Sequence, residues 1–196
     1  MGEISRFKGL GTELARKSMH MLIAAVPCLA AINFSNTALL LMGGILFYSW
    51  AESMRFLGFS LPVISPVTAA VLRKREHGRF ALGPVTLGLG TLLSLLIFPA
   101  DIAAASIYAL AFGDSAAGVA GRFLGRFRPA FLAGKSLEGS IACFAVAFLA
   151  GFLVFRDWKI AMAVGFGAMV ADALPIKDFD NLLLPLTAGF CAMFFI

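Results

Sequence analysis

Long runs of apolar residues, separated by short polar segments, dominate the pattern along this chain. Seven runs approach or reach the roughly 20 apolar residues that a helix needs to cross the hydrocarbon core of a bilayer. They cover residues 17–34, 37–58, 80–98, 103–121, 136–155, 160–175 and 182–196. A further apolar segment, 61–72, contains Pro62 and Pro66 and is predicted to be a re-entrant or interfacial piece. The pattern predicts an all-α, polytopic transmembrane bundle of about seven spans, forming a single domain over residues 1–196.

Composition agrees with this interpretation. The chain is 60% hydrophobic and only 14% charged, whereas soluble domains carry about 25% charged residues. Its cysteines, Cys28, Cys143 and Cys191, lie inside apolar runs without metal-type spacing. We therefore predict neither a disulfide framework nor a zinc site. No small-residue cleavage site follows the first run, which is predicted to be a retained helix.

The net charge of +5 comes from basic residues in short loops between the apolar runs. This distribution is typical of an orientation signal and not of a nucleic-acid-binding protein. If the N-terminus is cytoplasmic, 13 of the 16 Lys and Arg residues face the cytoplasm and only Arg156 and Lys159 face outward. We predict a cytoplasmic N-terminus, an external C-terminus and residence in the inner membrane of a prokaryotic cell. The pattern does not predict an oligomeric state.

With this topology, ionisable residues collect at the cytoplasmic ends of the spans, and Asp101 and Asp157 are the outer acidic exceptions. Ionisable groups in a bilayer are costly and usually mark a polar site. The sequence therefore predicts a site that opens to the cytoplasm. The residues concerned are Glu13, Arg16, Lys17, His20, Glu52, Arg55, Asp114, Lys135, Glu138, Asp172, Asp178, Asp180 and Asn181.

Two of these groups have both a structural and a functional interpretation. Glu13, Arg16, Lys17 and His20 form one stripe on a helix, which fits a solvated helix start with snorkelling cations. His20 fits this interpretation less well, since it lies one turn deeper beside an apolar run. Glu52 and Arg55 are three residues apart. Either they form an ion pair on one helix, or the Arg55 guanidinium faces a phosphate group.

The segment from Gly113 to Pro129 combines packing and charge. Gly113, Ala117, Gly121 and Gly125 have the small-x-x-x-small spacing of close helix packing. Asp114, a carboxylate within an apolar span, needs a partner, and Mg²⁺ with bound phosphates is one candidate. Three arginines follow in this segment, and they either make the mouth of a cavity positive or serve as a topology signal alone. They are Arg122, Arg126 and Arg128.

Two further segments fit phosphate and metal binding. G-K-S-L-E-G-S, residues 134–140, resembles an anion-binding helix start with the point charge of Lys135. It is not a Walker A loop, because Pro129 stands where that motif requires glycine. Asp178, Asp180 and Asn181 are suited to Mg²⁺ or, equally, to capping the last helix.

Four segments, in this order, resemble motifs of the CTP-dependent lipid kinases, which include dolichol kinase, phytol and farnesol kinases and yeast-type diacylglycerol kinase. The motifs E-x-x-R-K-x-x-H, G-D-x-x-A-x-x-x-G, K-S-x-E-G-S and D-N-x-x-x-P-L match residues 13–20, 113–121, 135–140 and 180–186. Order and spacing hold over most of the chain. One departure is Asp172, which stands where the family usually has glutamate.

The resemblance implies transfer of the γ-phosphate of CTP, with Mg²⁺ or another divalent cation, to a membrane lipid alcohol: a polyprenol, a phytol-like isoprenoid or diacylglycerol. Such transfer depends mainly on positioning and charge neutralisation. The implied metal ligands are Asp114, Glu138 and Asp180, with Asp114 catalytic and Asp180 or His20 accepting the hydroxyl proton. The implied nucleotide-binding residues are Arg16, Lys17, Arg55, Gly113, Arg122, Arg126, Lys135, Ser136 and Asn181.

Two other functions remain as alternatives. A cytidylyltransferase acting on a phosphatidate-like lipid would use a similar G-D segment, but it would release pyrophosphate where a kinase releases CDP. A small transporter would need polar residues through the full depth of the bilayer, and the outer halves of the predicted spans are almost free of charge.

Overall fold

The computed structural model describes residues 17–59, 80–129, 132, 134–176 and 178–196. Within these residues the protein is all-helical and contains no strand. Glu13, Arg16 and the predicted re-entrant segment 61–72 lie outside the described residues. The helices are α2 (Val26–Ile32), α3 (Phe34–Phe56), α5 (Gly83–Ile97), α6 (Ala100–Tyr108), η2 (Ala109–Asp114), α7 (Ser115–Phe123), α8 (Leu137–Phe155), α9 (Trp158–Ala173) and α10 (Asp180–Met193).

Helix starts follow local capping chemistry. The Asn33 side chain accepts a hydrogen bond from the Asn36 amide at 2.9 Å, so α3 begins directly after α2. Ser136 in the same way accepts from the amide of Gly139 at the start of α8. Such side chains satisfy amides that have no partner inside the helix.

The apolar helices indicate an integral membrane protein. Three helical stretches are long and apolar enough to cross a membrane: Phe34–Phe56, the continuous Ala100–Phe123, and Leu137–Phe155. Lys17–Ile32 and Gly83–Ile97 are shorter apolar helices, while α9 has 16 residues and α10 has 14. The predicted all-α fold is thus confirmed, whereas the seven-span count, the orientation and the single domain stay predictions.

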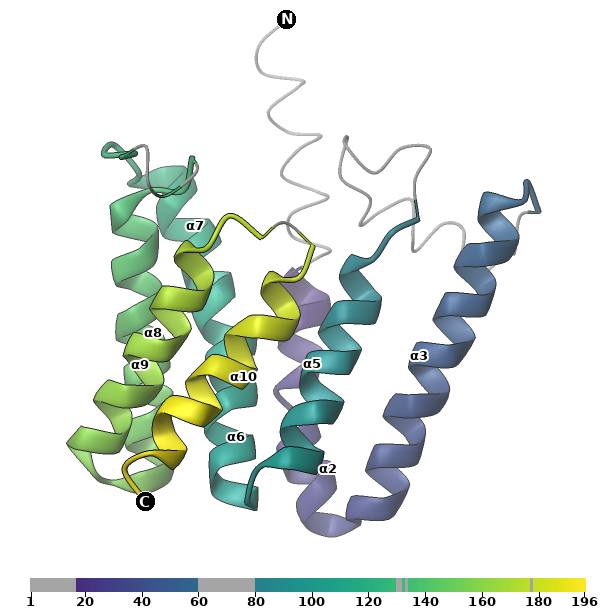
Figure 1. Cartoon of the computed structure of the whole chain (residues 1–196), viewed down its shortest axis with the longest axis horizontal. Coiled ribbons are helices and arrows are strands. Elements are labelled where there is room, and N and C mark those ends of the chain that lie inside the picture. The colour runs from purple at the N-terminus through teal and green to yellow at the C-terminus, as the bar shows by residue number, and fades with distance from the viewer. Residues whose placement is uncertain (1–16, 60–79, 130–131, 133, 177) are drawn as a thin grey trace, which may run out of the picture.

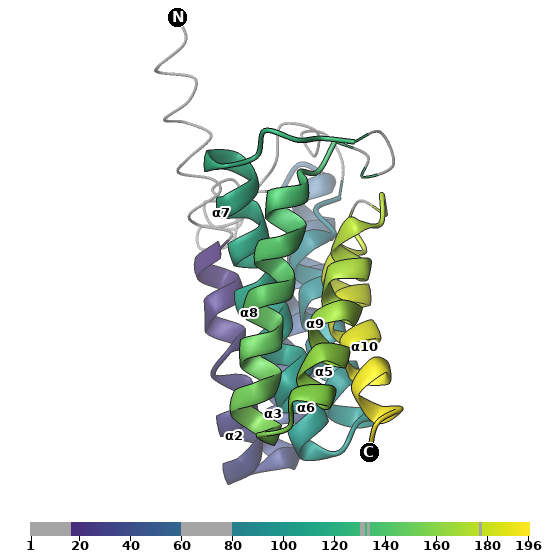
Figure 2. The ribbon, with the colours of Figure 1, turned by 90° about the vertical axis from the view of Figure 1, so that its left-hand side faces the viewer.

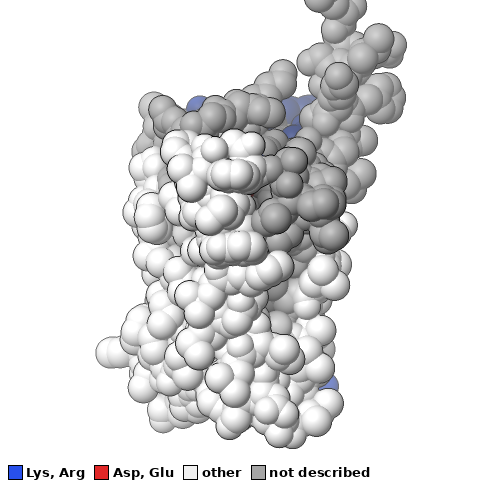
Figure 3. All heavy atoms as spheres, turned by 90° about the vertical axis from the view of Figure 1, so that its right-hand side faces the viewer, with Lys and Arg blue, Asp and Glu red and all other residues white. Residues whose placement is uncertain are grey.

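The helices stand side by side in one bundle (Figures 1 and 2). The stretch Ala100–Phe123 runs through its core, where Ile102, Ile107 and Leu110 are fully buried. On the neighbouring side α9 packs between α8 and α10, and α10 packs on α5. Helix α3 lies at the edge. The face on that side carries almost only uncharged side chains among the described residues (Figure 3), as expected for a lipid-facing surface.

Connections that lie far apart in the sequence meet at one end of the bundle. The α7–α8 connection, the α9–α10 connection and the start of α5 are all at the upper end in Figure 1, whereas the C-terminus and the α8–α9 turn are at the lower end. The upper end is called the site end below. It brings together three of the segments whose motifs resemble a kinase, namely 113–121, 135–140 and 180–186.

Small residues allow α7 to approach α8 closely at the site end. A Cβ atom added to Gly139 would lie 2.9 Å from the Ala117 carbonyl oxygen, and one added to Gly121 would lie 3.0 Å from Ser136 Oγ. The Gly139 distance is too short for a real Cβ contact with backbone, so glycine is required there, whereas a Cβ at Gly121 would force Ser136 Oγ to shift. The small-x-x-x-small spacing therefore has the packing role that it predicts.

Candidate functional site

A cavity of about 490 Å³ opens at the site end, between α7, the start of α8 and the α9–α10 connection. Its wall combines positive and negative side chains with hydroxyl groups, a composition that is costly in an apolar bundle and that marks a functional site. The polar lining residues are Asp114, Arg122, Arg128, Lys135, Ser136, Ser140, Asp172 and Asp180.

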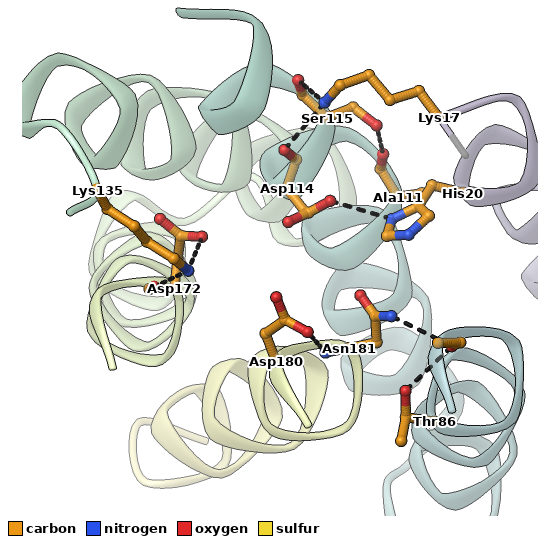
Figure 4. A network of polar contacts seen from close by, with 11 residues as sticks. Lys17, His20, Thr86, Ala111, Asp114, Ser115, Lys135, Asp172, Asp180 and Asn181 are labelled. Carbon is orange, nitrogen blue, oxygen red and sulfur yellow. Dashed lines mark hydrogen bonds and ion pairs between the residues drawn. The ribbon is translucent and has the colours of Figure 1, made fainter. Parts of the chain in front are cut away.

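Asp114 lies on this wall and is contacted by the apolar helix Lys17–Ile32, called the first helix below (Figure 4). Its Oδ2 atom is 3.3 Å from Nδ1 of His20, and the two side chains are 14% and 3% exposed. The ammonium of Lys17 donates to the Ser115 carbonyl at 2.6 Å and lies 3.4 Å from the Asp114 carbonyl. Two residues of the predicted stripe, Lys17 and His20, thus contact Asp114, although neither of them lines the cavity.

Lys135 and Asp172 form an ion pair across the cavity wall, between the start of α8 and the end of α9 (Figure 4). Lys135 Nζ is 2.9 Å from Asp172 Oδ1 and also donates to the Asp172 carbonyl. Asp172 is 5% exposed, whereas Lys135 is 35% exposed. The ammonium therefore has a fixed anchor and still faces the cavity.

The α7–α8 connection is fastened by two charged side chains. Glu138 Oε1 accepts the backbone amides of Arg126 and Phe127, at 2.9 Å and 3.1 Å. The Arg128 guanidinium donates to the carbonyls of Gly121 and Gly134, at 2.8 Å and 2.6 Å. These bonds hold the connection against α7 and leave Arg128 beside the cavity.

The last motif supplies one cavity residue and one packing residue. Asp180 lines the cavity and accepts the Asn181 amide at 3.1 Å. The Asn181 side chain is buried and donates to the Gly83 carbonyl at 3.3 Å, which joins α10 to α5. Asn181 therefore positions α10 and does not line the cavity.

Some predicted nucleotide-binding residues have other contacts. Arg55 pairs with Glu52 through two bonds of 2.7 Å and 2.6 Å, and Glu52, fully buried, also accepts the Ala81 amide. Of the two interpretations of Arg55, the ion pair is the one observed. Gly113 packs against Cys143, and its assignment to nucleotide binding stays a prediction. The side chain of Arg126 is exposed and does not line the cavity.

Asp114, Glu138 and Asp180 are the carboxylates predicted to bind Mg²⁺. No three His, Cys, Asp or Glu side chains among the described residues form a ready metal site. Glu138 binds the connection through Oε1 and does not line the cavity, and its assignment as a metal ligand stays a prediction. Asp114 and Asp180 share the cavity wall. Enzymes often hold Mg²⁺ by one or two carboxylates plus substrate phosphates, and this pair fits an ion that arrives with a nucleotide.

Ser140, Asp172 and Arg128, to which the sequence assigned no nucleotide-binding or metal-binding role, also line the cavity. Ser140 follows Ser136 by four residues, so helical periodicity places it on the same face of α8. Asp172 reaches the cavity only because α9 packs on α8. Among the predicted residues, Asp114, Arg122, Lys135, Ser136 and Asp180 are brought together on the cavity wall.

Comparison with curated proteins finds CTP-dependent diacylglycerol kinases. The chain is 35% identical over 80 residues to CTP-dependent diacylglycerol kinase 1 of Eremothecium gossypii, covering 41% of this chain and 25% of that protein. The chain is 25% identical over 171 residues to CTP-dependent diacylglycerol kinase 1 of Schizosaccharomyces pombe, covering 79% of this chain and 74% of that protein. To the Saccharomyces cerevisiae enzyme it is 36% identical over 77 residues, covering 39% and 26%.

These similarities confirm the resemblance to the CTP-dependent lipid kinases. The chain spans about a quarter of the length of the Eremothecium and Saccharomyces proteins in these matches. No protein-family model matches the chain. No solved structure matches the chain.

Proposed function

We propose that this chain transfers the γ-phosphate of CTP to the hydroxyl group of a membrane lipid alcohol, at the cytoplasmic face of the membrane. The observation that carries the proposal is the cavity at the site end, where cationic and anionic side chains share one wall of an otherwise apolar bundle. Diacylglycerol is the first acceptor to test, because three similar proteins are named diacylglycerol kinases. Polyprenols and phytol-like alcohols are the alternatives.

The cationic side chains of the cavity wall would bind the nucleotide. Lys135 is anchored by Asp172 near the start of α8, where helix amides favour anions. Arg122 and Arg128 line the same cavity from α7 and its connection. Guanidinium groups match phosphate oxygens in two-point contacts. These three side chains would hold the triphosphate and offset the charge that develops during transfer.

The carboxylates of the cavity wall would bind the metal ion and accept the proton of the lipid hydroxyl group. Mg²⁺ carried by the nucleotide would be held by Asp114 and Asp180 and would neutralise phosphate charge. Asp180 is also the stronger candidate for accepting the hydroxyl proton, because it lines the cavity and His20 does not. His20 instead contacts Asp114, which its ring holds in orientation.

The acceptor would enter past an apolar edge of the cavity. Leu174, Pro175 and Ile176 line it on the α9–α10 connection, and all three are exposed. An exposed apolar edge beside a polar interior fits a lipid alcohol, whose hydroxyl must reach the phosphate while its chains stay in hydrocarbon.

Purified protein in mixed micelles with γ-labelled CTP tests the proposal. We expect label in the lipid product and release of CDP, with diacylglycerol, a polyprenol and phytol compared as acceptors. A chelator should abolish transfer, and ATP should replace CTP poorly. Release of pyrophosphate with cytidine in the lipid would identify a cytidylyltransferase instead. Absence of transfer to every acceptor would refute the proposal.

A further inference from the structure

The helix that carries Asp114 is irregular at that residue. Between α6 and α7 the chain forms a π-helical turn, η2, over Ala109–Asp114, and Asp114 is its last residue. A π turn inserts one residue into an α-helix and changes the direction of the side chains that follow, and such turns are frequent at functional sites. The direction of the Asp114 carboxylate therefore depends on whether this turn is maintained.

Side chains bind to carbonyl groups at and next to the turn. Ser115, the first residue of α7, donates its Oγ hydrogen to the Ala111 carbonyl inside the turn at 2.7 Å. From the first helix, the Lys17 ammonium donates to the Ser115 carbonyl at 2.6 Å and lies close to the Asp114 carbonyl, where η2 changes into α7. One helical turn further along, His20 contacts the Asp114 carboxylate. The first helix thus contacts both the backbone and the side chain of Asp114 (Figure 4).

The position of Lys17 differs from that of a phosphate ligand. Lys17 is buried, and it does not line the cavity that Lys135, Arg122 and Arg128 border. A buried ammonium requires polar partners, and here two backbone carbonyls of the π-to-α junction provide them. Its positive charge therefore lies inside the protein, against the backbone of the π-to-α junction.

We infer that Lys17 is a positioning residue, which fixes the π-to-α junction and so aims the Asp114 carboxylate at the cavity. The inference rests on the proposed function, because it assigns Lys17 a role in the transfer step through Asp114. It departs from the prediction that Lys17 binds the nucleotide.

Lys17→Met tests the inference, because it removes the ammonium while keeping most of the side-chain length. We expect kcat to fall about 10- to 100-fold, and the KM for CTP to change less than about threefold, as for a loss confined to the transition state. CTP binding measured by calorimetry should match wild type. Lys17→Arg, which keeps charged donors, should recover part of kcat. Lys135→Met is the matched control, with CTP binding weakened at least about tenfold.

Amide hydrogen exchange supplies a readout that is independent of activity. In Lys17→Met, peptides covering residues 109–119 should exchange faster, while those from α8 and α9 should not change. Uniformly faster exchange with normal kcat per folded molecule would show general destabilisation and overturn the inference. So would weakened CTP binding with unchanged kcat, or wild-type behaviour throughout. If Lys17→Met does not fold, Lys17→Gln is measured in its place.

The two proposals fail separately. Inactive wild-type protein with every acceptor would refute the proposed function. Local exchange that is unchanged in Lys17→Met would refute the inference even if wild-type protein is fully active.

Discussion

Because the two partners of the Lys135–Asp172 ion pair differ in exposure, we predict that replacing Lys135 destabilises the protein more than replacing Asp172. Asp172 is 5% exposed and Lys135 is 35% exposed. Lys135→Met leaves a buried carboxylate without its cation, which we expect to cost about 3 kcal/mol, the lower end of the range for breaking a buried pair. Asp172→Asn leaves the Lys135 ammonium, which still donates to the backbone carbonyl of residue 172 and is solvated in the open cavity. We expect that change to cost only about 1 kcal/mol.

Unfolding in detergent, followed by the loss of helical circular dichroism, measures this difference. The double variant should be less destabilised than the sum of the two single variants, because an asparagine beside methionine no longer carries an unpaired charge. The affinity for CTP should rank the variants in the same order. Lys135→Met should lose CTP affinity, and Asp172→Asn should keep most of it. Equal destabilisation by the single variants, or strict additivity in the double variant, would refute this reasoning.

Three further predictions concern single contacts. Asp114→Asn should reduce turnover about 10²- to 10⁴-fold, with thermal stability unchanged or raised because the charge of a half-buried carboxylate is lost; a folded variant with normal turnover would contradict its role. Glu138→Ala should lower stability by about 1–2 kcal/mol through the freed amides of Arg126 and Phe127, whereas Glu138→Gln, which keeps an acceptor oxygen, should behave like wild type. A Glu138 that bound metal would instead fail in both variants. Gly139→Ala should destabilise by about 1–3 kcal/mol through contact with α7, and the same change at Gly43, where nothing lies near an added Cβ, is the control in the same unfolding assay.

The apolar pattern predicts the helices well, because in a membrane the length and hydrophobicity of a run largely decide where a helix forms. The residues gathered at the cavity were also predicted to share one end, because alternating topology places Asp114, Lys135 and Asp180 on the same side. Sequence spacing determines this grouping without knowledge of how the helices pack.

The roles of individual charges could not be predicted in the same way. Whether Glu138 binds a metal or two amides depends on the path of the α7–α8 connection, and that path is set by long-range contacts. Asp172 acquires its partner only when α9 packs on α8. The π turn before Ser115 could not be predicted, because the run that contains it is apolar on all sides and has no helical periodicity that an inserted residue would visibly shift.

The short helices α9 and α10 have a consequence for the surrounding lipid. At about 1.5 Å per residue they extend roughly 24 Å and 21 Å, less than a hydrocarbon core of about 30 Å. As membrane-crossing elements they would create hydrophobic mismatch, which a bilayer relieves by thinning locally. The headgroup layer would then sink toward the α9–α10 connection and carry the hydroxyl group of a lipid alcohol to the level of Asp180. Activity in vesicles should accordingly be higher in lipids with shorter acyl chains, and a constant rate across chain lengths would contradict this view.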